Sequence, residues 1–189
     1  MTPGNPHAII GGKQKGPPGR SRRPFHGREH SLITLEPLTE DNLAEARAIR
    51  RAGVPEDFVD TVDELMELTR YGLEHHCAGR TFLARLEGAP VGVILLGEAI
   101  PWSTDPEEMR ARPFYRLMGL LIDSRCRGRG IGGQVLDQAV ERIYQEFGPR
   151  PIALGCHRDN GDAARFWLRQ GFRPTQAMEG DDRYYLREL

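Results

Sequence analysis

A short stretch of glycine and arginine, residues 125–133, constrains this chain more than any other feature. It reads RCRGRGIGG and follows an apolar run at 117–122, which predicts a buried strand. After it, apolar residues recur at the spacing of one helix face: Val135, Leu136, Ala139, Val140, Ile143, Tyr144 and Phe147. A glycine turn before a helix leaves backbone N–H groups open to an anion at the helix's positive end. Arg127 and Arg129 add forked donors, so we expect a diphosphate-binding loop.

Two types of phosphate-binding loop fit this stretch. Gly128, Gly130 and Gly133 satisfy the G-x-G-x-x-G spacing of dinucleotide-binding folds, but too little chain follows for the further βα units of such a fold. The segment 127–132 also fits the pattern Arg/Gln-x-x-Gly-x-Gly/Ala. A third interpretation is a glycine-rich turn that joins a strand to a helix and binds nothing.

A second motif favours the Arg/Gln-x-x-Gly-x-Gly/Ala loop. Asn160, Ala163, Gly171 and Phe172 fit the pattern Asn-x-x-Ala-x-x-x-Tyr-x-x-x-Gly-Phe, with Trp167 where tyrosine is usual. Together and in this order, the two motifs resemble those of the GNAT superfamily of acyl-CoA-dependent N-acyltransferases. The resemblance covers residues 31–189 and implies an α/β fold: a mixed sheet of about seven strands with about four helices.

The same resemblance implies how acetyl-CoA would be held. The strand before the loop would diverge from the next strand, and pantetheine would lie in the gap against backbone groups of Leu121, Ile122 and Asp123. The backbone N–H groups of Arg127, Gly128, Arg129, Gly130, Ile131 and Gly132 would hold the diphosphate. Asn160 would reach the pantetheine arm beside Ala163, and Trp167 would lie near the thioester. No metal is expected, because the three cysteines and six histidines show no ligand spacing.

Acetyl transfer from a thioester requires a neutral amine, whereas an alkylamine titrates near pH 10.4. Glu98, at the end of a predicted strand, is our candidate general base, with a surface glutamate as the alternative. Asp123 is more simply a structural acceptor. Trp167 cannot protonate the leaving thiolate, although its position implies a catalytic role, and Tyr184, Tyr185 and His157 are possible substitutes as the acid.

Within the superfamily, short segments resemble the spermine/spermidine-type diamine N-acetyltransferases: 39–42, 56–59, 121–123 and 179–182. The acceptor would then be a small polyamine or diamine that attacks the thioester directly. Three alternatives remain: a protein N-terminus or lysine, an aminoglycoside-like antibiotic, and a coenzyme A-binding regulator without turnover. The acidic residues between and into the first two predicted helices form either a solvated helix face or a lip that attracts a polycation: Glu56, Asp57, Asp60, Asp63, Glu64 and Glu67.

Charge and composition set the remaining expectations. Residues 1–30 carry a net charge of +5 within a chain of net charge −1, and they are rich in glycine and proline. We therefore expect a disordered basic tail at 1–30, followed by one domain at 31–189. No apolar run is long enough to span a membrane, and a sparse, odd cysteine count suits a reducing cytoplasm. Nucleic acid is not an expected partner, a homodimer is left open, and the arginine-rich composition suggests a bacterial source.

The remaining elements follow from periodicity and turn residues. We expect a strand at 32–35, helices over about 41–53 and 60–76, a hairpin of 81–86 with 91–96, and an irregular connection over 99–113. A strand at 114–123 leads into the glycine loop and its helix. After that helix we expect a strand at 151–156, a helix at 162–170, and a last hairpin of 172–178 with 183–189.

Overall fold

The computed structural model describes residues 33–55, 58–99, 103, 105, 107–110 and 112–189. Its strands are β1 (Ile33–Pro37), β2 (Gly79–Leu86), β3 (Ala89–Glu98), β4 (Tyr115–Ile122), β5 (Ile152–His157), β6 (Arg173–Glu179) and β7 (Asp182–Arg187). Its α-helices are α1 (Leu43–Arg47), α2 (Val62–Glu74), α3 (Glu107–Arg110), α4 (Ile131–Phe147) and α5 (Gly161–Arg169). The predicted basic tail at 1–30 and the first residue of the predicted strand, Leu32, lie outside the described residues.

The strands form one mixed sheet in the order β1-β2-β3-β4-β5-β7-β6. Every neighbouring pair is antiparallel except β4 and β5, which are parallel. The two predicted hairpins are β2–β3 and β6–β7. The predicted α/β fold of a mixed seven-stranded sheet is therefore confirmed.

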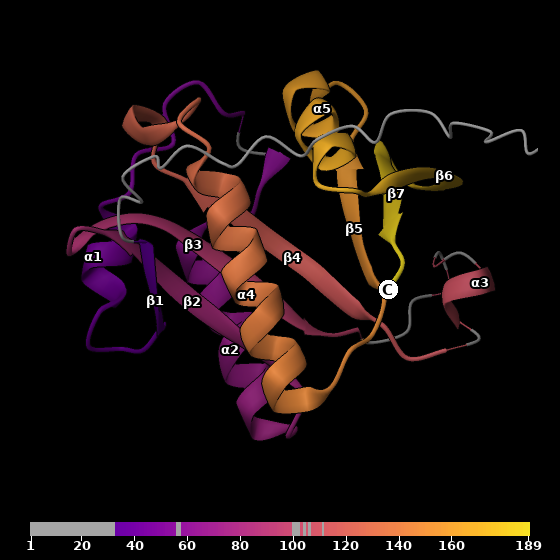
Figure 1. Ribbon diagram of the computed structural model, residues 1–189, viewed down its shortest axis with the longest axis horizontal. Helices are drawn as coiled ribbons and strands as arrows, with labels where there is room; N and C mark the ends of the chain where they lie inside the picture. Colours follow the sequence, from indigo (N-terminus) through magenta and orange to yellow (C-terminus); the bar gives the residue numbers. More distant parts are fainter. Residues whose placement is uncertain (1–32, 56–57, 100–102, 104, 106, 111) are drawn as a thin grey trace, which may run out of the picture. The chain divides into compact units, whose positions relative to one another are not determined.

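Helices pack on both faces of the sheet (Figure 1), with α4 on one face and α1 and α2 on the other. The α4 face carries the larger core, in which Val135, Leu136 and Ile143 meet alternate residues of the central strands. On the opposite face, Leu65 and Met66 of α2 pack against Leu83 and Val93. The period of 3.6 in the helices and of 2 in the strands directs these apolar residues inward.

Two elements differ from the sequence prediction. Helix α1 ends at Arg47, whereas the apolar pattern extended it to about residue 53. The reason is a tertiary contact: the backbone of Arg50 donates to the Asp123 carboxylate at 3.2 Å and accepts from the Ser124 N–H at 3.0 Å. Within the expected irregular connection, α3 forms one helical turn whose Met109 is buried.

Candidate acyl carrier and acceptor cleft

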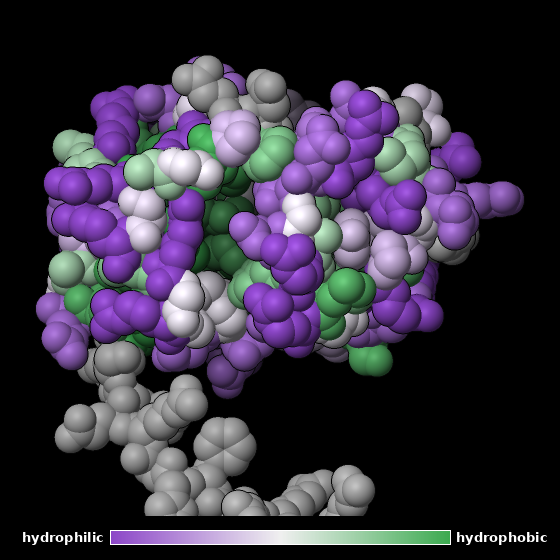
Figure 2. Space-filling view, turned by 90° about the horizontal axis from the view of Figure 1, so that it is seen from above, coloured by the Kyte–Doolittle hydropathy of each residue, from purple (hydrophilic) through white to green (hydrophobic). Residues whose placement is uncertain are grey.

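The parallel strands β4 and β5 separate soon after they begin. They pair only at Tyr115 with Ile152 and at Arg116 with Ala153. Beyond these pairs the strands diverge, and a cleft of about 1060 Å³ opens between the rest of β4, the loop before α4, and α5. In Figure 2 this side of the molecule is hollowed, with hydrophobic residues at the bottom of the hollow and hydrophilic residues around it. A gap between diverging strands was expected from the family resemblance.

The glycine-rich loop forms one end of the cleft. Gly128 and Gly130 have φ angles of +73° and +78°, and a Cβ added to either would meet open space. Glycine is favoured at both positions because the backbone is left-handed there. Gly130 precedes the first residue of α4, and no side chain caps this helix. The first N–H groups of a 17-residue helix are thus open to an anion from the cleft.

Asp123 holds the start of this loop in place. Its buried carboxylate accepts from the backbone N–H of Arg125 at 2.9 Å and from the Arg125 guanidinium at 2.9 and 2.7 Å. The bonds from Arg125 lower the pKa of Asp123 far below its ordinary value, although burial opposes them. Asp123 is therefore a structural acceptor, as its position suggested.

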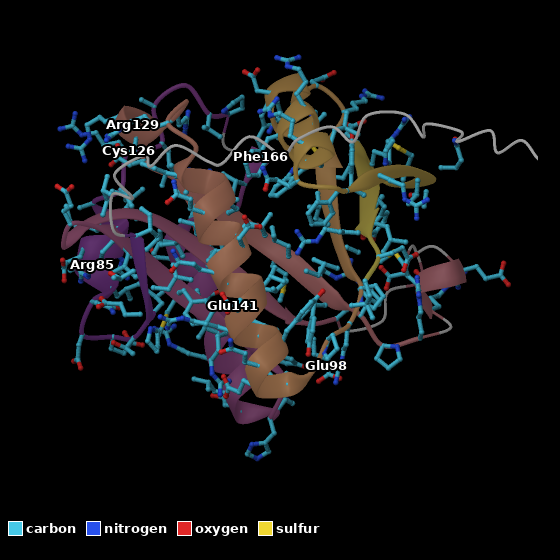
Figure 3. All side chains as sticks on the ribbon, in the orientation of Figure 1. Arg85, Glu98, Cys126, Arg129, Glu141 and Phe166 are labelled. Carbon is cyan, nitrogen blue, oxygen red and sulfur yellow. The ribbon has the colours of Figure 1, made fainter. Side chains whose placement is uncertain are left out.

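The arginines of the loop differ in their contacts. Arg127 lines the cleft and donates to the carbonyls of Ile122 at 3.3 Å and Ala52 at 3.1 Å. Arg129 is exposed and is not among the residues that line the cleft; Figure 3 shows it beside Cys126 at this end of the sheet. Among the predicted residues of the loop, Arg127, Gly128, Gly130, Ile131 and Gly132 are the ones brought together around the cleft.

The backbone of β4 presents alternate residues to the gap. The N–H of Asp123 donates to Val91 of β3 at 2.8 Å, and Leu121 pairs with Val93 two residues earlier. In an antiparallel pair, successive residues direct their N–H and C=O groups to opposite sides. Leu121 and Asp123 therefore face β3, while Leu120 and Ile122 face the gap. The sequence motif indicated the strand but not this alternation.

Helix α5 forms the opposite wall. The Asn160 side chain accepts from the N–H of Ala163 at 3.1 Å and so caps the helix. Asn160, Ala163 and Trp167 all line the cleft. The indole of Trp167 is buried between Phe166 and Phe172, with ring centroids 4.7 and 5.5 Å away in edge-to-face contacts.

Two predicted catalytic residues do not line the cleft. The Glu98 carboxylate accepts from the N–H of Ala78 and from Arg150, both at 3.1 Å. Figure 3 shows Glu98 at the end of the sheet opposite Cys126 and Phe166. Tyr184 is 1% exposed, and its hydroxyl donates to Glu179 at 2.8 Å. Neither residue is among those that line the cleft, and the roles given to them stay sequence predictions.

The side of the cleft toward α2 is acidic, and the sequence motifs did not identify this arrangement. Asp60 lies just before α2, Glu64 lies in its first turn, and Asp182 lies at the start of β7. Burial raises the pKa of both Asp60 and Asp182. Phe58 stacks on His157 of β5, with ring centroids 4.9 Å apart, so the α1–α2 connection contacts the far strand. Of the predicted acidic lip, Asp60 and Glu64 line the cleft, whereas Glu56 and Asp57 lie outside the described residues.

Other kinds of site are not formed by the described residues. No group of three or more histidine, cysteine or acidic residues within the described ranges could hold a metal ion. Within the same ranges, none of the helices combines the length and apolar character that a membrane crossing requires. Burial raises the pKa of the Cys156 thiol, which lines the cleft, to about 11. This thiol is protonated at neutral pH and is a poor nucleophile.

Comparison with known proteins agrees with the cleft and its loop. The sequence model of the acetyltransferase (GNAT) family matches residues 43–172, from the start of α1 to just beyond α5. An uncharacterized N-acetyltransferase of Methanocaldococcus jannaschii is 26% identical over 99 residues, which are 52% of this chain and 41% of that protein. The match therefore spans about two fifths of the length of this curated relative.

Solved structures share the fold at low sequence identity. The structure of AAC(6')-Ib with paromomycin and acetyl-CoA has a TM-score of 0.64 and 18% identity, covering 82% of this chain and 93% of that one. Naa50 of Arabidopsis thaliana, with the bisubstrate analogue CoA-Ac-MVNAL, has a TM-score of 0.56 and 20% identity over 82% and 96%. A ribosomal-protein-alanine N-acetyltransferase of Brucella melitensis has a TM-score of 0.58 and 18% identity over 82% and 99%. At these identities the likeness is one of fold, and the acceptors named differ between the three.

Proposed function

Because the chain belongs to the acetyltransferase (GNAT) family, we propose that it transfers an acetyl group from acetyl-CoA to a primary amine of a small diamine or polyamine. The observation that carries the choice of acceptor is the pair of partly buried carboxylates, Asp60 and Asp182, on the α2 side of the cleft. Carboxylates that line a cleft attract a cationic substrate and raise its local concentration.

In this proposal the diphosphate lies on the N–H groups from Arg127 to Gly132, with Gly128 and Gly130 leaving room for it. The uncapped start of α4 supports this placement. Pantetheine then runs along β4 and pairs with the backbone groups of Leu120 and Ile122, because these face the gap. Asn160 and Ala163 contact it from α5. The side chain of Arg129, which lies outside the cleft lining, can reach outward to the phosphates.

The chemistry is proposed to be direct attack of the amine on the thioester. The protonated thiol of Cys156 argues against an acetyl-cysteine intermediate at that residue. Trp167 would pack against the acetyl end, where its indole excludes water but cannot donate a proton to sulfur as an acid. Since a thiol has an ordinary pKa near 8.5, the thiolate leaves without a strong acid beside it.

Glu98 and Tyr184 remain the sequence-based predictions for the base and the acid. Their contacts favour other roles. Glu98, the last residue of β3, accepts hydrogen bonds from the Ala78 N–H and from Arg150. These bonds lower the pKa of Glu98, which makes its carboxylate a weaker base. The Tyr184 hydroxyl is committed to Glu179 within a buried cluster.

The test measures thiol release from acetyl-CoA with amines of similar length that differ in the number of their cationic groups. We expect turnover with 1,4-diaminobutane and spermidine, and a KM at least tenfold higher for butylamine, which lacks the second cation. An alanine-terminated peptide and kanamycin are tested in the same assay. Faster turnover of either would overturn the choice of a small polyamine, and coenzyme binding without release for any amine would favour a regulator.

A further inference from the structure

We propose that the Asp182 carboxylate is the general base that takes the proton from the acceptor ammonium. This inference rests on the proposed function, since it concerns the amine that attacks acetyl-CoA in the same cleft. It assigns a catalytic role to a residue outside both sequence motifs.

The position of Asp182 relative to the gap is the first support. Its carboxylate lies over Gly155 of β5: an added Cβ at Gly155 would be 3.2 Å from Asp182 Oδ2. Gly155 is two residues beyond the last β4–β5 pair, Arg116 with Ala153, so it lies where the strands begin to separate. On β4 the residue at the same step is Met118, where the pairing with β3 shifts register. In the proposed placement, the carrier would run from the glycine loop along β4 toward this point.

The face of the sheet is the second support. Leu154 and Cys156 point into the core beneath α4 and α5, the side on which the glycine loop and Trp167 lie. Because neighbouring strand residues alternate, Gly155 and His157 face the other side, where His157 stacks on Phe58. Asp182 pairs with His157 across the β5–β7 ladder and shares that side. An amine held on that side would attack the thioester carbonyl from the sheet face opposite α4 and α5.

The freedom of the carboxylate is the third support. Three other carboxylates at or beside the cleft are paired: Asp123 with Arg125, Glu64 with the Thr61 cap, and Asp162 with Arg165. The Asp159 carboxylate, which also lines the cleft, lies 4.0 Å from His157 Nδ1. Among the described residues, the Asp182 carboxylate has no hydrogen-bond or ion-pair partner, and the charges that act on it come from His157, Glu179 and Asp181. The pKa of Asp60, across the cleft, is likewise shifted by burial and by nearby charges, and not by a hydrogen bond. Burial raises the pKa of Asp182, which makes its carboxylate a stronger base.

The ammonium gives one proton to Asp182 and becomes a neutral amine, whose lone pair forms the C–N bond with the thioester carbon. The C–S bond breaks, and its electron pair leaves on sulfur. The second proton lost from nitrogen neutralises the thiolate, and Asp182 returns its proton to water.

The experiment compares Asp182→Asn with Asp181→Asn, using the amine that the wild type acetylates fastest. Both variants remove one negative charge, but Asp181 is exposed, pairs with Arg158 and does not line the cleft. We expect Asp182→Asn to lower kcat by roughly 10²- to 10³-fold, the range typical of proton-transfer catalysis, and Asp181→Asn to stay within about twofold. Coenzyme A affinity, measured by calorimetry, should be unchanged in both, which shows that the variants are folded.

The pH profile separates a base from a simple electrostatic role. Wild-type kcat should fall as the pH drops through the pKa of Asp182 and level off above it. In Asp182→Asn, kcat should instead rise about tenfold per pH unit toward the pKa of the amine, because water and hydroxide must accept the proton. Asp182→Glu should restore part of the loss. Parallel profiles, or a change in KM alone, would overturn the assignment; a wild type that acetylates no amine would instead overturn the proposed function.

Discussion

Replacing Gly130 by aspartate tests the cofactor loop through a single added charge. Gly130 is the residue before α4, its φ is +78°, and a Cβ there would meet no atom within 4 Å. Aspartate and asparagine are the side chains that best tolerate this left-handed backbone. Gly130→Asn is therefore a control of the same shape and the same backbone cost, about 1 kcal/mol of stability.

The expected loss follows from the distance between the new carboxylate and the diphosphate. Two unit charges 4 Å apart interact by about 4 kcal/mol at an effective dielectric of 20. Position 130 is exposed, so solvent reduces this to about 1.5–3 kcal/mol. Gly130→Asp should then bind coenzyme A roughly 10- to 100-fold more weakly than Gly130→Asn.

Calorimetric titration of coenzyme A into both variants, at two salt concentrations, provides the measurement. The difference between aspartate and asparagine should shrink as salt rises, because screening acts on the charge and not on the shape. Equal affinities for the two variants at low salt would refute the placement of the diphosphate on this loop. Pantetheine, which lacks the diphosphate of coenzyme A, should bind both variants equally.

Four further changes test the remaining assignments. Trp167→Tyr should keep or raise turnover while costing about 1–3 kcal/mol of stability through lost packing, and a large loss of turnover would give the indole a role of its own. Glu98→Gln should change turnover less than about twofold and stability by about 0.5–1 kcal/mol; a hundredfold loss would restore Glu98 as the base. Asp60→Asn should raise the KM for a diamine about tenfold with little change in kcat, whereas unchanged KM would argue against cation attraction. Asp123→Asn should lower the denaturation midpoint at pH 7; since the folded pKa of Asp123 is lowered, this difference should persist above about pH 4 and disappear as the pH falls further.

Much of the fold could be predicted because its signals are local. The apolar period on α4, the turn at Gly88 and the glycine stop after α5 each act within a few residues, and each marks an element that the structure has. The end of α1 could not be predicted in this way. Its backbone is diverted by Asp123, 73 residues from Arg50 in the sequence, and no local pattern records such a contact.

The same distinction divides the cleft. The loop proposed to hold the diphosphate is continuous in sequence, and its backbone has positive φ angles at Gly128 and Gly130, where glycine is favoured. The backbone groups of Leu120 and Ile122 face the gap because those of Leu121 face β3. Which residues of β4 bond to β3 is a property of the register. A motif indicates the strand, but the register decides which of its groups remain open.

The acceptor side that we propose is assembled from residues that are far apart in the chain. Asp60 lies just before α2, Gly155 lies within β5, and Asp182 begins β7, so no spacing rule unites them. Gly155 contributes through the space it leaves: a methyl group there would press against Asp182. In our proposal the acyl carrier side depends on backbone groups that many side chains can support, while the acceptor side depends on a few carboxylates. A change of acceptor would then require few substitutions and leave the loop intact.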